Sequence, residues 1–262
     1  MEGEIILPET TVRAMISLLS DVAALNGNIA AKRKHLMDGL CVLTKADSWY
    51  WTMMGDIETE KAPAHTIFLK NGFSDHEFSA YLKTQEHPDM KWMTAPFLEA
   101  LNHSEGQITR LGSQVTSLDR LSQSSILPLL LEAGIGQVIL SGRPTSSGQL
   151  SVIVMGRKGG RDDFTLLESR IAHILLSEVR WLHDESWPEH PREGISNLSP
   201  RLRTVLTLLL QGCGRKQIAS DLEISIHTLG DYVKELYAVF GVHSQAELLR
   251  RFVEGDGGDL TP

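Results

Sequence analysis

The chain has 262 residues, a formal net charge of -8 and 42% hydrophobic residues. This length suits one domain of ordinary size and a smaller second one, and the composition is that of a globular protein. We find no uncharged apolar stretch long enough to cross a membrane and no N-terminal pattern typical of a secretory signal. The two cysteines, Cys41 and Cys213, are too few for a disulfide framework. A cytoplasmic protein without a membrane partner is therefore expected.

The negative charge is concentrated in the N-terminal part of the chain. Residues 197–262 contain seven Lys or Arg and eight Asp or Glu, so their net charge is -1. Three of these acids, Glu254, Asp256 and Asp259, lie in a glycine-rich tail. A weakly positive surface in the C-terminal part is thus compatible with the acidic whole.

The first half of the chain alternates between helical and strand patterns. Helices are predicted over 10–25 and 29–45, followed by strands over 48–54 and 65–70. Ser74 and Glu77 form a capping-box pattern that predicts a helix over 74–85. Residues 86–122 show no clear pattern apart from a strand at 107–111.

The pattern becomes regular again after residue 123. A helix is predicted over 124–133, and strands over 135–141 and 149–156 are joined by a polar loop. Asp162 and Asp163 suit the N-terminal end of a long helix over 162–183. Prolines and a glycine among charged residues make 184–196 a linker.

These elements predict an α+β domain with a sheet and covering helices. The order of elements, the segment from Leu40 to Asp47 and the segment from Gly160 to Glu168 resemble a GAF-like sensor domain. The resemblance covers about residues 10–183. It implies a sensory or dimerisation domain at residues 1–183.

Residues 197–253 contain four short amphipathic helices. Ser199 precedes Pro200 as a natural N-cap, and a second helix is predicted from Lys216 to Leu222. A third helix starts after Ser225 and runs to Phe240, and a capping box from Ser244 to Glu247 opens the fourth.

The third helix is the most informative element. Leu229, Val233, Leu236 and Phe240 fall on one buried stripe, and the opposite side carries small or polar residues, namely His227, Asp231, Lys234 and Ala238. A helix of this shape fits the major groove of DNA. The second helix would then cross the phosphate backbone, with Arg215 and Lys216 at its start.

Several short segments resemble the LuxR-type helix-turn-helix in both order and spacing. They are Leu198-Ser-Pro-Arg201, Val205-Leu206, Gly212, Lys216-Gln-Ile-Ala219, Leu222, Ile224-Ser225, Thr228-Leu229, Phe240-Gly-Val242 and Ser244-Gln-Ala-Glu-Leu248. The resemblance implies a transcription regulator with an all-α DNA-binding domain at 197–253, a linker at 184–196 and a flexible tail at 254–262. The DNA-binding residues are then expected to be Arg215, Lys216, Ser225, His227, Thr228, Asp231 and Lys234.

The chain departs from that family at the third helix. Gly230 and Asp231 follow Thr228-Leu229, where the family commonly has a lysine. The loss of this lysine leaves an alternative open, in which a degenerate helix-turn-helix serves a protein-interaction adaptor and no longer reads DNA. A small helical bundle used only for interaction is the less specific interpretation of the same four helices.

No other segment predicts chemistry. The histidines lack metal-ligand spacing and no GxSxG elbow is present, so we expect no cofactor, no metal and no enzyme activity. Trp49 and Trp51 lie on one face of a strand; they are candidate walls of a ligand pocket, but we favour a role in the core.

The expected partners are double-stranded DNA, a second copy of the chain, and a small-molecule or protein effector at the N-terminal domain. RNA polymerase is a further candidate. For the homodimer, the helix at 162–183 is the favoured interface, and the last helix, with Leu248, Leu249 and Phe252, is the other candidate.

Overall fold

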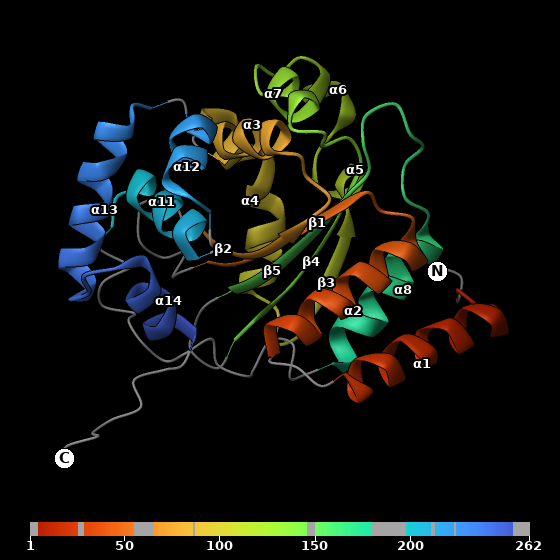
Figure 1. Cartoon of the computed structure of the whole chain (residues 1–262). Coiled ribbons are helices and arrows are strands. Elements are labelled where there is room, and N and C mark those ends of the chain that lie inside the picture. Colours follow the sequence, from red (N-terminus) through yellow and green to blue (C-terminus); the bar gives the residue numbers. More distant parts are fainter. Residues whose placement is uncertain are drawn as a thin grey trace. The chain divides into compact units, whose positions relative to one another are not determined.

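A computed structural model describes residues 5–25, 29–54, 65–85, 87–145, 150–179, 198–210, 213–222 and 224–253. The chain forms two compact units, the first holding most of residues 1–184 and the second residues 185–262. The first unit contains a sheet with helices, and the second is helical (Figure 1). The expected α+β class with a helical C-terminal domain is therefore confirmed.

The N-terminal unit is built on a five-stranded sheet in the order β2-β1-β5-β4-β3. Its strands are β1 (Ser48–Met54), β2 (His65–Asn71), β3 (Ile108–Leu111), β4 (Val138–Pro144) and β5 (Leu150–Gly156). The β1–β5, β4–β5 and β3–β4 pairs are antiparallel. All five strands match strands expected from the sequence, although β4 begins at Val138 and not at Ile135.

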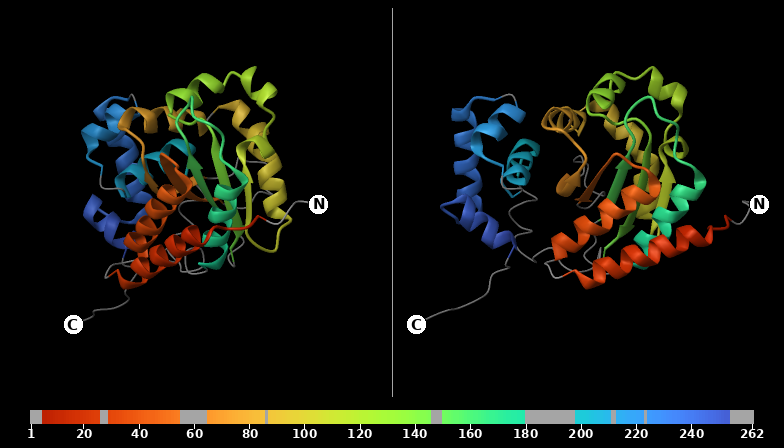
Figure 2. Two further views of the ribbon diagram at one scale, coloured as in Figure 1. Left: turned by 90° about the vertical axis from the view of Figure 1, so that its right-hand side faces the viewer. Right: turned by 45° about the vertical axis from the view of Figure 1, so that its right-hand side comes forward.

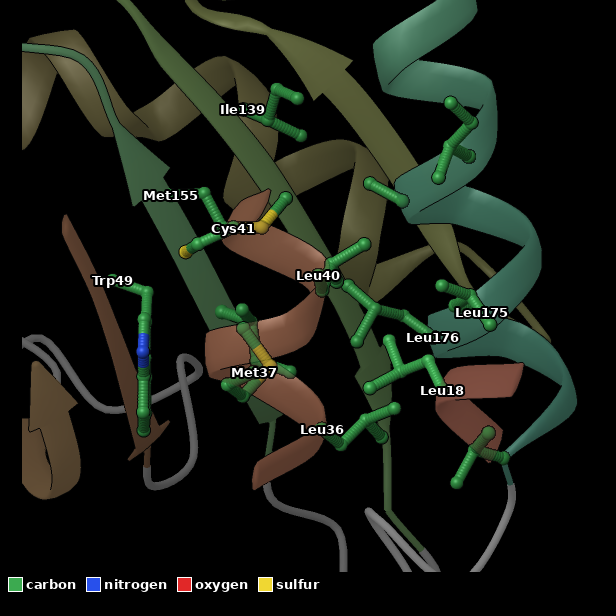
Figure 3. Close-up of a cluster of buried hydrophobic side chains, with 14 of the residues drawn as sticks. Leu18, Leu36, Met37, Leu40, Cys41, Trp49, Ile139, Met155, Leu175 and Leu176 are labelled. Carbon is green, nitrogen blue, oxygen red and sulfur yellow. The ribbon is translucent and has the colours of Figure 1, made fainter. Parts of the chain in front are cut away.

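Two helices cover one face of this sheet, α2 (Ile29–Thr44) and α8 (Leu166–Glu178), and α1 (Glu9–Ala24) packs against α2 (Figures 1 and 2). Trp49 from β1 and Ile139 from β4 pack there against Leu40 of α2 and Leu175 of α8 (Figure 3). Trp51 of β1 belongs to the same cluster. These five side chains are at most 2% exposed. The apolar sides of α2 and α8 therefore bury this face of the sheet, and α1 adds Met15, Leu18 and Val22 to the same main core.

The other face carries a second cluster. Val152 and Val154 of β5 pack against Phe97 and Leu101 of α4 (Pro88–Asn102). Beside it lies α3 (Asp75–Gln85), whose Tyr81 ring is 4.7 Å from that of Tyr50. The sequence did not reveal α4, because Pro96 inside it interrupts the helical pattern.

Three short helices lie between β3 and β4: α5 (Gly112–Val115), α6 (Leu118–Ser122) and α7 (Leu127–Glu132). The helix expected over 124–133 is therefore shorter than predicted. It begins at Leu127, with Pro128 in its first turn. It ends before Gly134, as predicted, and Gly134 has the left-handed φ of 69° that terminates a helix.

The start of α8 was predicted wrongly. The helix begins at Leu166, and its N-cap is Thr165, whose hydroxyl accepts from the Glu168 amide while Glu168 accepts from the Thr165 amide. Asp162 and Asp163 stay outside the helix because their carbonyl groups accept hydrogen bonds from the buried Arg157 guanidinium. At the other end Val179 leaves the helical conformation, and residues 180–183 lie outside the described residues.

Arg157 fixes this junction. It donates to the Thr44 carbonyl and, over 2.7 Å, to the Glu168 carboxylate. Burial by itself raises the pKa of Glu168, but the hydrogen bonds from Thr165 and Arg157 hold that pKa below its usual range. The ends of α2 and β5 and the start of α8 are thus joined by one buried side chain.

Candidate nucleic-acid interface

Four helices form the C-terminal unit: α11 (Pro200–Leu210), α12 (Arg215–Asp221), α13 (Ile226–Phe240) and α14 (Gln245–Val253). Helix α13 packs against α11 and α12, and α14 packs against α11. The buried residues that join them include all four members of the predicted stripe, Leu229, Val233, Leu236 and Phe240, each at most 1% exposed. The stripe inferred from the spacing is therefore confirmed.

Local hydrogen bonds set where these helices begin and how they are joined. The Leu202 amide donates to the Ser199 hydroxyl, as expected for an N-cap. Arg201 donates to the Leu222 carbonyl at the end of α12 over 2.7 Å, and Gln245 donates to the carbonyls of Leu209 and Cys213. The angles between the helices are thus fixed by side-chain bonds as well as by the core.

Helix α12 presents the first pair of predicted DNA-binding residues. Arg215 and Lys216 are exposed, and so are Gln217 and Ser220, while Ile218 is buried. The helix begins at Arg215, one residue earlier than predicted, and Gly214 is its N-cap without a side-chain bond. Two cations therefore stand free of the core at the start of a short helix.

Helix α13 presents the other predicted residues. The Ser225 hydroxyl accepts from the Thr228 amide at 3.0 Å and lies 2.8 Å from the Thr228 hydroxyl, so these two residues cap the helix together. Further along, His227, Asp231 and Lys234 are all exposed. A helix with one fully buried stripe and a polar opposite side can enter a groove as wide as the major groove of DNA.

The exposed side of α13 is less positive than a count of its cations suggests. The Lys234 ammonium lies 3.6 Å from the Asp231 carboxylate, and Glu235 is exposed as well. In addition, nothing lies within 4 Å of the position where a side chain at Gly230 would begin. The exposed side of α13 therefore has one cation, two acids and a bare position.

Sequence reasoning missed Ile226. Its spacing from Leu229 places it among the apolar positions, yet the side chain is 54% exposed in the first turn of α13. An apolar side chain beside His227 and Thr228 can contact the methyl group of thymine. The only available signal was its place immediately after the N-cap, before the buried stripe begins.

The two tryptophan candidates belong to the core of the N-terminal unit. Trp49 is 1% exposed and donates from its indole to Asp38, and Trp51 is 2% exposed and donates to the Ser151 hydroxyl. The Arg33 guanidinium lies over the Trp51 ring, 4.4 Å from its centre. Both indoles thus have partners from their own chain.

One group in the N-terminal unit has the residue types of a hydrolase triad. His87, Asp89 and Ser125 lie together where α4 begins, and Ser125 donates to the Asp89 carboxylate at 2.8 Å. The His87 Nδ1 atom accepts from the Asp89 amide, so its proton is on Nε2, the atom 3.4 Å from the Ser125 hydroxyl. His87 therefore cannot take the Ser125 proton there, and the group acts as a helix cap.

Within the described ranges, no cluster of three or more His, Cys, Asp or Glu is arranged to hold a metal ion. No helix in the same ranges is both long and apolar enough to cross a membrane.

Comparison with known proteins shows what the C-terminal unit is similar to. Residues 196–252 match the family of bacterial regulatory proteins called the luxR family. Over 143 aligned residues the chain is 28% identical to the DNA-binding transcriptional activator DevR/DosR of Mycobacterium tuberculosis. The aligned region covers 52% of this chain and 60% of that protein. Over 60 aligned residues the chain is 37% identical to the "Probable transcriptional regulator ycf29" of Cyanophora paradoxa. The aligned region covers 23% of this chain and 29% of that protein.

Among solved structures, the chain is similar to SdiA in complex with octanoyl-rac-glycerol, with a TM-score of 0.45 and 16% identity over 94% of this chain and 95% of that one. A structure of Escherichia coli SdiA gives a TM-score of 0.43 and 16% identity over 93% and 98% of the two chains. The chain thus spans 29% and 60% of the two curated relatives and nearly all of SdiA.

Proposed function

We propose that this protein is a DNA-binding transcription regulator, on the premise that its residues 196–252 form a helix-turn-helix domain of the LuxR family. The observation that supports this most directly is α13, whose buried stripe leaves His227, Thr228 and Asp231 exposed on one side. These side chains would read base edges in the major groove. Arg215 and Lys216 would contact phosphates and fix the orientation of the domain.

The N-terminal unit would supply the control. It has its own sheet and core, and it joins the helix-turn-helix domain through residues 180–197, which lie outside the described residues. We propose a sensory role for it, in which a small molecule or a protein changes how the protein binds DNA. The GAF-like character expected from the sequence is part of this proposal, and so is a homodimer that binds two half-sites.

A second candidate is an adaptor whose helix-turn-helix binds a protein. Two observations favour it: the Asp231–Lys234 pair, which lowers the positive charge of α13, and the exposed apolar side chains of Ile226 and Val239. The two functions differ in their dependence on salt, because each phosphate contact releases counterions.

The experiment is a titration of labelled duplex DNA from upstream of the protein's own gene, followed by fluorescence anisotropy at several salt concentrations. The Lys216→Ala variant should bind every duplex more weakly, and the slope of log K against log salt should become less negative by about 0.9. Lys91→Ala is the matched control, since Lys91 is an exposed lysine of α4 and should leave the slope unchanged.

An adaptor would give no saturable DNA binding at low salt. If the Lys216→Ala variant binds as tightly as the parent with the same slope, the phosphate contact assigned to Lys216 is wrong.

A further inference from the structure

The sheet face that packs against α2 and α8 changes from apolar to polar along its strands. Paired residues on antiparallel strands point to the same face, and so do residues two apart on one strand. Residues paired across the strands thus form rows on this face. The first, apolar row consists of Leu111, Ile139, Met155 and Trp49. The second row consists of Thr109, Ser141, Ile153 and Trp51, and the third row includes Arg143 and Ser151. Gly142, between Ser141 and Arg143, faces Leu101 of α4 on the opposite side, which confirms the alternation.

The second row contains a continuous set of hydrogen bonds. The Thr109 and Ser141 hydroxyls are 2.6 Å apart, and His173 of α8 places its Nδ1 atom 3.1 Å from the Thr109 hydroxyl. Gln107 donates its amide N–H to the Ser141 hydroxyl at 2.8 Å. This network holds the Gln107 amide in one orientation, with its oxygen directed elsewhere.

The third row contains two polar atoms that have no partner among the described residues. The Gln107 Oε1 atom and the Arg143 Nε atom are both buried and make no hydrogen bond there. Arg143 also forms no ion pair with a carboxylate in the described part of the chain. Gln107 directly precedes Ile108, which pairs with Gly142, so Gln107 and Arg143 are cross-strand neighbours. Two neighbouring residues thus each have one buried polar atom without a partner in the described part of the chain, although such groups are normally satisfied.

We propose that Gln107 and Arg143 bind a small carboxylic acid that carries a hydroxyl or amino group on the carbon next to the carboxylate. The Arg143 Nε–H donor and positive charge suit a carboxylate. The Gln107 oxygen accepts a hydrogen bond, so it requires a donor on the same ligand.

The spacing sets the size of the ligand. Cross-strand neighbours have Cβ atoms about 5 Å apart, so a small ligand with the two functional groups on adjoining carbon atoms can contact both side chains. Both residues are half-buried as a whole while the two atoms themselves are buried, so part of each side chain remains accessible to solvent.

The site is separate from the helix-turn-helix domain, and it gives the proposed sensory role a ligand class. Only the link between this site and the sensory role rests on the proposed function, because binding of the acid itself needs no DNA.

The test is isothermal titration calorimetry of the full chain with L-lactate and with L-alanine. Propionate, which lacks the donor, and ethylamine, which lacks the carboxylate, are the matched probes. We expect saturable binding of lactate or alanine and at least about tenfold weaker binding of both matched probes. The absence of saturable binding for lactate and alanine, or equal binding of propionate, overturns the proposal.

Two variants locate the site. Gln107→Leu removes the acceptor and Arg143→Gln removes the cation, and each should weaken binding at least about tenfold. Arg143→Lys keeps the charge without the Nε–H group and should restore only part of the affinity, which guards against simple unfolding of the Gln variant. Arg13→Gln removes an exposed arginine of α1 and should bind like the parent. Unchanged binding in both site variants overturns the assignment.

DNA binding is measured separately, by anisotropy with and without the bound acid. A protein that binds the acid but not DNA contradicts the proposed function and supports the site. A protein that binds DNA but none of the acids contradicts the site alone.

Discussion

The Asp231 carboxylate lies 3.6 Å from the Lys234 ammonium, one turn further along α13, on the side of the helix that faces away from the core. Both side chains are largely exposed, 63% and 80%, so the pair contributes little to the stability of the fold. Its effect is on binding. A carboxylate at this place repels phosphate and holds the single lysine of the exposed side in an internal pair.

We therefore predict that Asp231→Asn increases the affinity for every duplex a few-fold, because the change frees Lys234 and removes a negative charge that repels phosphate. The salt slope should become steeper by up to about 0.9 as Lys234 gains a phosphate contact. Anisotropy titrations on duplexes of different sequence measure both quantities. Glu99→Gln, an equal change of charge at an exposed position of α4, should leave them unchanged. A loss of affinity confined to one base pair would instead mean that Asp231 accepts a hydrogen bond from a cytosine amino group.

The helix-turn-helix could be predicted in detail because its signals are local. The buried stripe of α13 repeats along one helix, the Ser225 cap is three residues from its partner Thr228, and Gly241 adopts φ 60° directly after the last turn. Such features need no knowledge of distant parts of the chain.

The errors came from contacts between distant residues. Asp162 and Asp163 have the composition of a helix start, but Arg157 holds their carbonyls in a loop and also reaches Thr44, which is 113 positions away. The partnerless atoms of Gln107 and Arg143 were equally invisible, because only the pairing of β3 with β4 brings these two residues together.

Gly230 offers a test of stability within α13. A β-carbon there would meet nothing within 4 Å, and glycine inside a helix costs about 1 kcal/mol relative to alanine. Gly230→Ala should therefore raise the free energy of unfolding of the C-terminal unit by roughly 0.5–1 kcal/mol, measured by urea denaturation of the full chain.

The contrast is Gly241, the C-cap of the same helix. Its backbone has φ 60°, so Gly241→Ala should lower the free energy of unfolding by about 1 kcal/mol. If both variants move stability in the same direction, helix propensity does not explain the effect at residue 230.

His173 should make stability depend on pH. Burial lowers its pKa, and the charges of Arg170 and Arg110 lower it further, while Glu178 acts in the opposite sense. Because the folded pKa lies below the unfolded one, the unfolded chain takes up the proton first as the pH falls. Stability from this group is therefore complete above about pH 6.5 and decreases as the pH falls toward the folded pKa.

The measurement compares the parent with His173→Asn in urea at pH 7.5 and pH 5.5. Asparagine keeps an atom near Nδ1 for the Thr109 hydroxyl and cannot titrate. The parent should lose more stability between these two pH values than the variant does. Equal losses would show that other groups account for the pH dependence.

The dimer is the prediction on which operator geometry depends. One helix-turn-helix of this size reads few base pairs, and α13 has a single lysine that is already paired, so two copies on adjacent half-sites would double the contacts. The broad apolar side of α8 suggested that this helix forms the interface. Its Ile171 and Leu175 pack inside the N-terminal core of their own chain, at 3% and 1% exposure, so this breadth does not require a partner. Leu182 lies outside the described residues.

Light scattering of the full chain at tens of micromolar should nevertheless give twice the chain mass of 29.1 kDa. Two chains should bind one duplex whose half-sites are about one helical turn apart. A mass of one chain, with one chain bound per duplex, would contradict the dimer and leave recognition to a single α13.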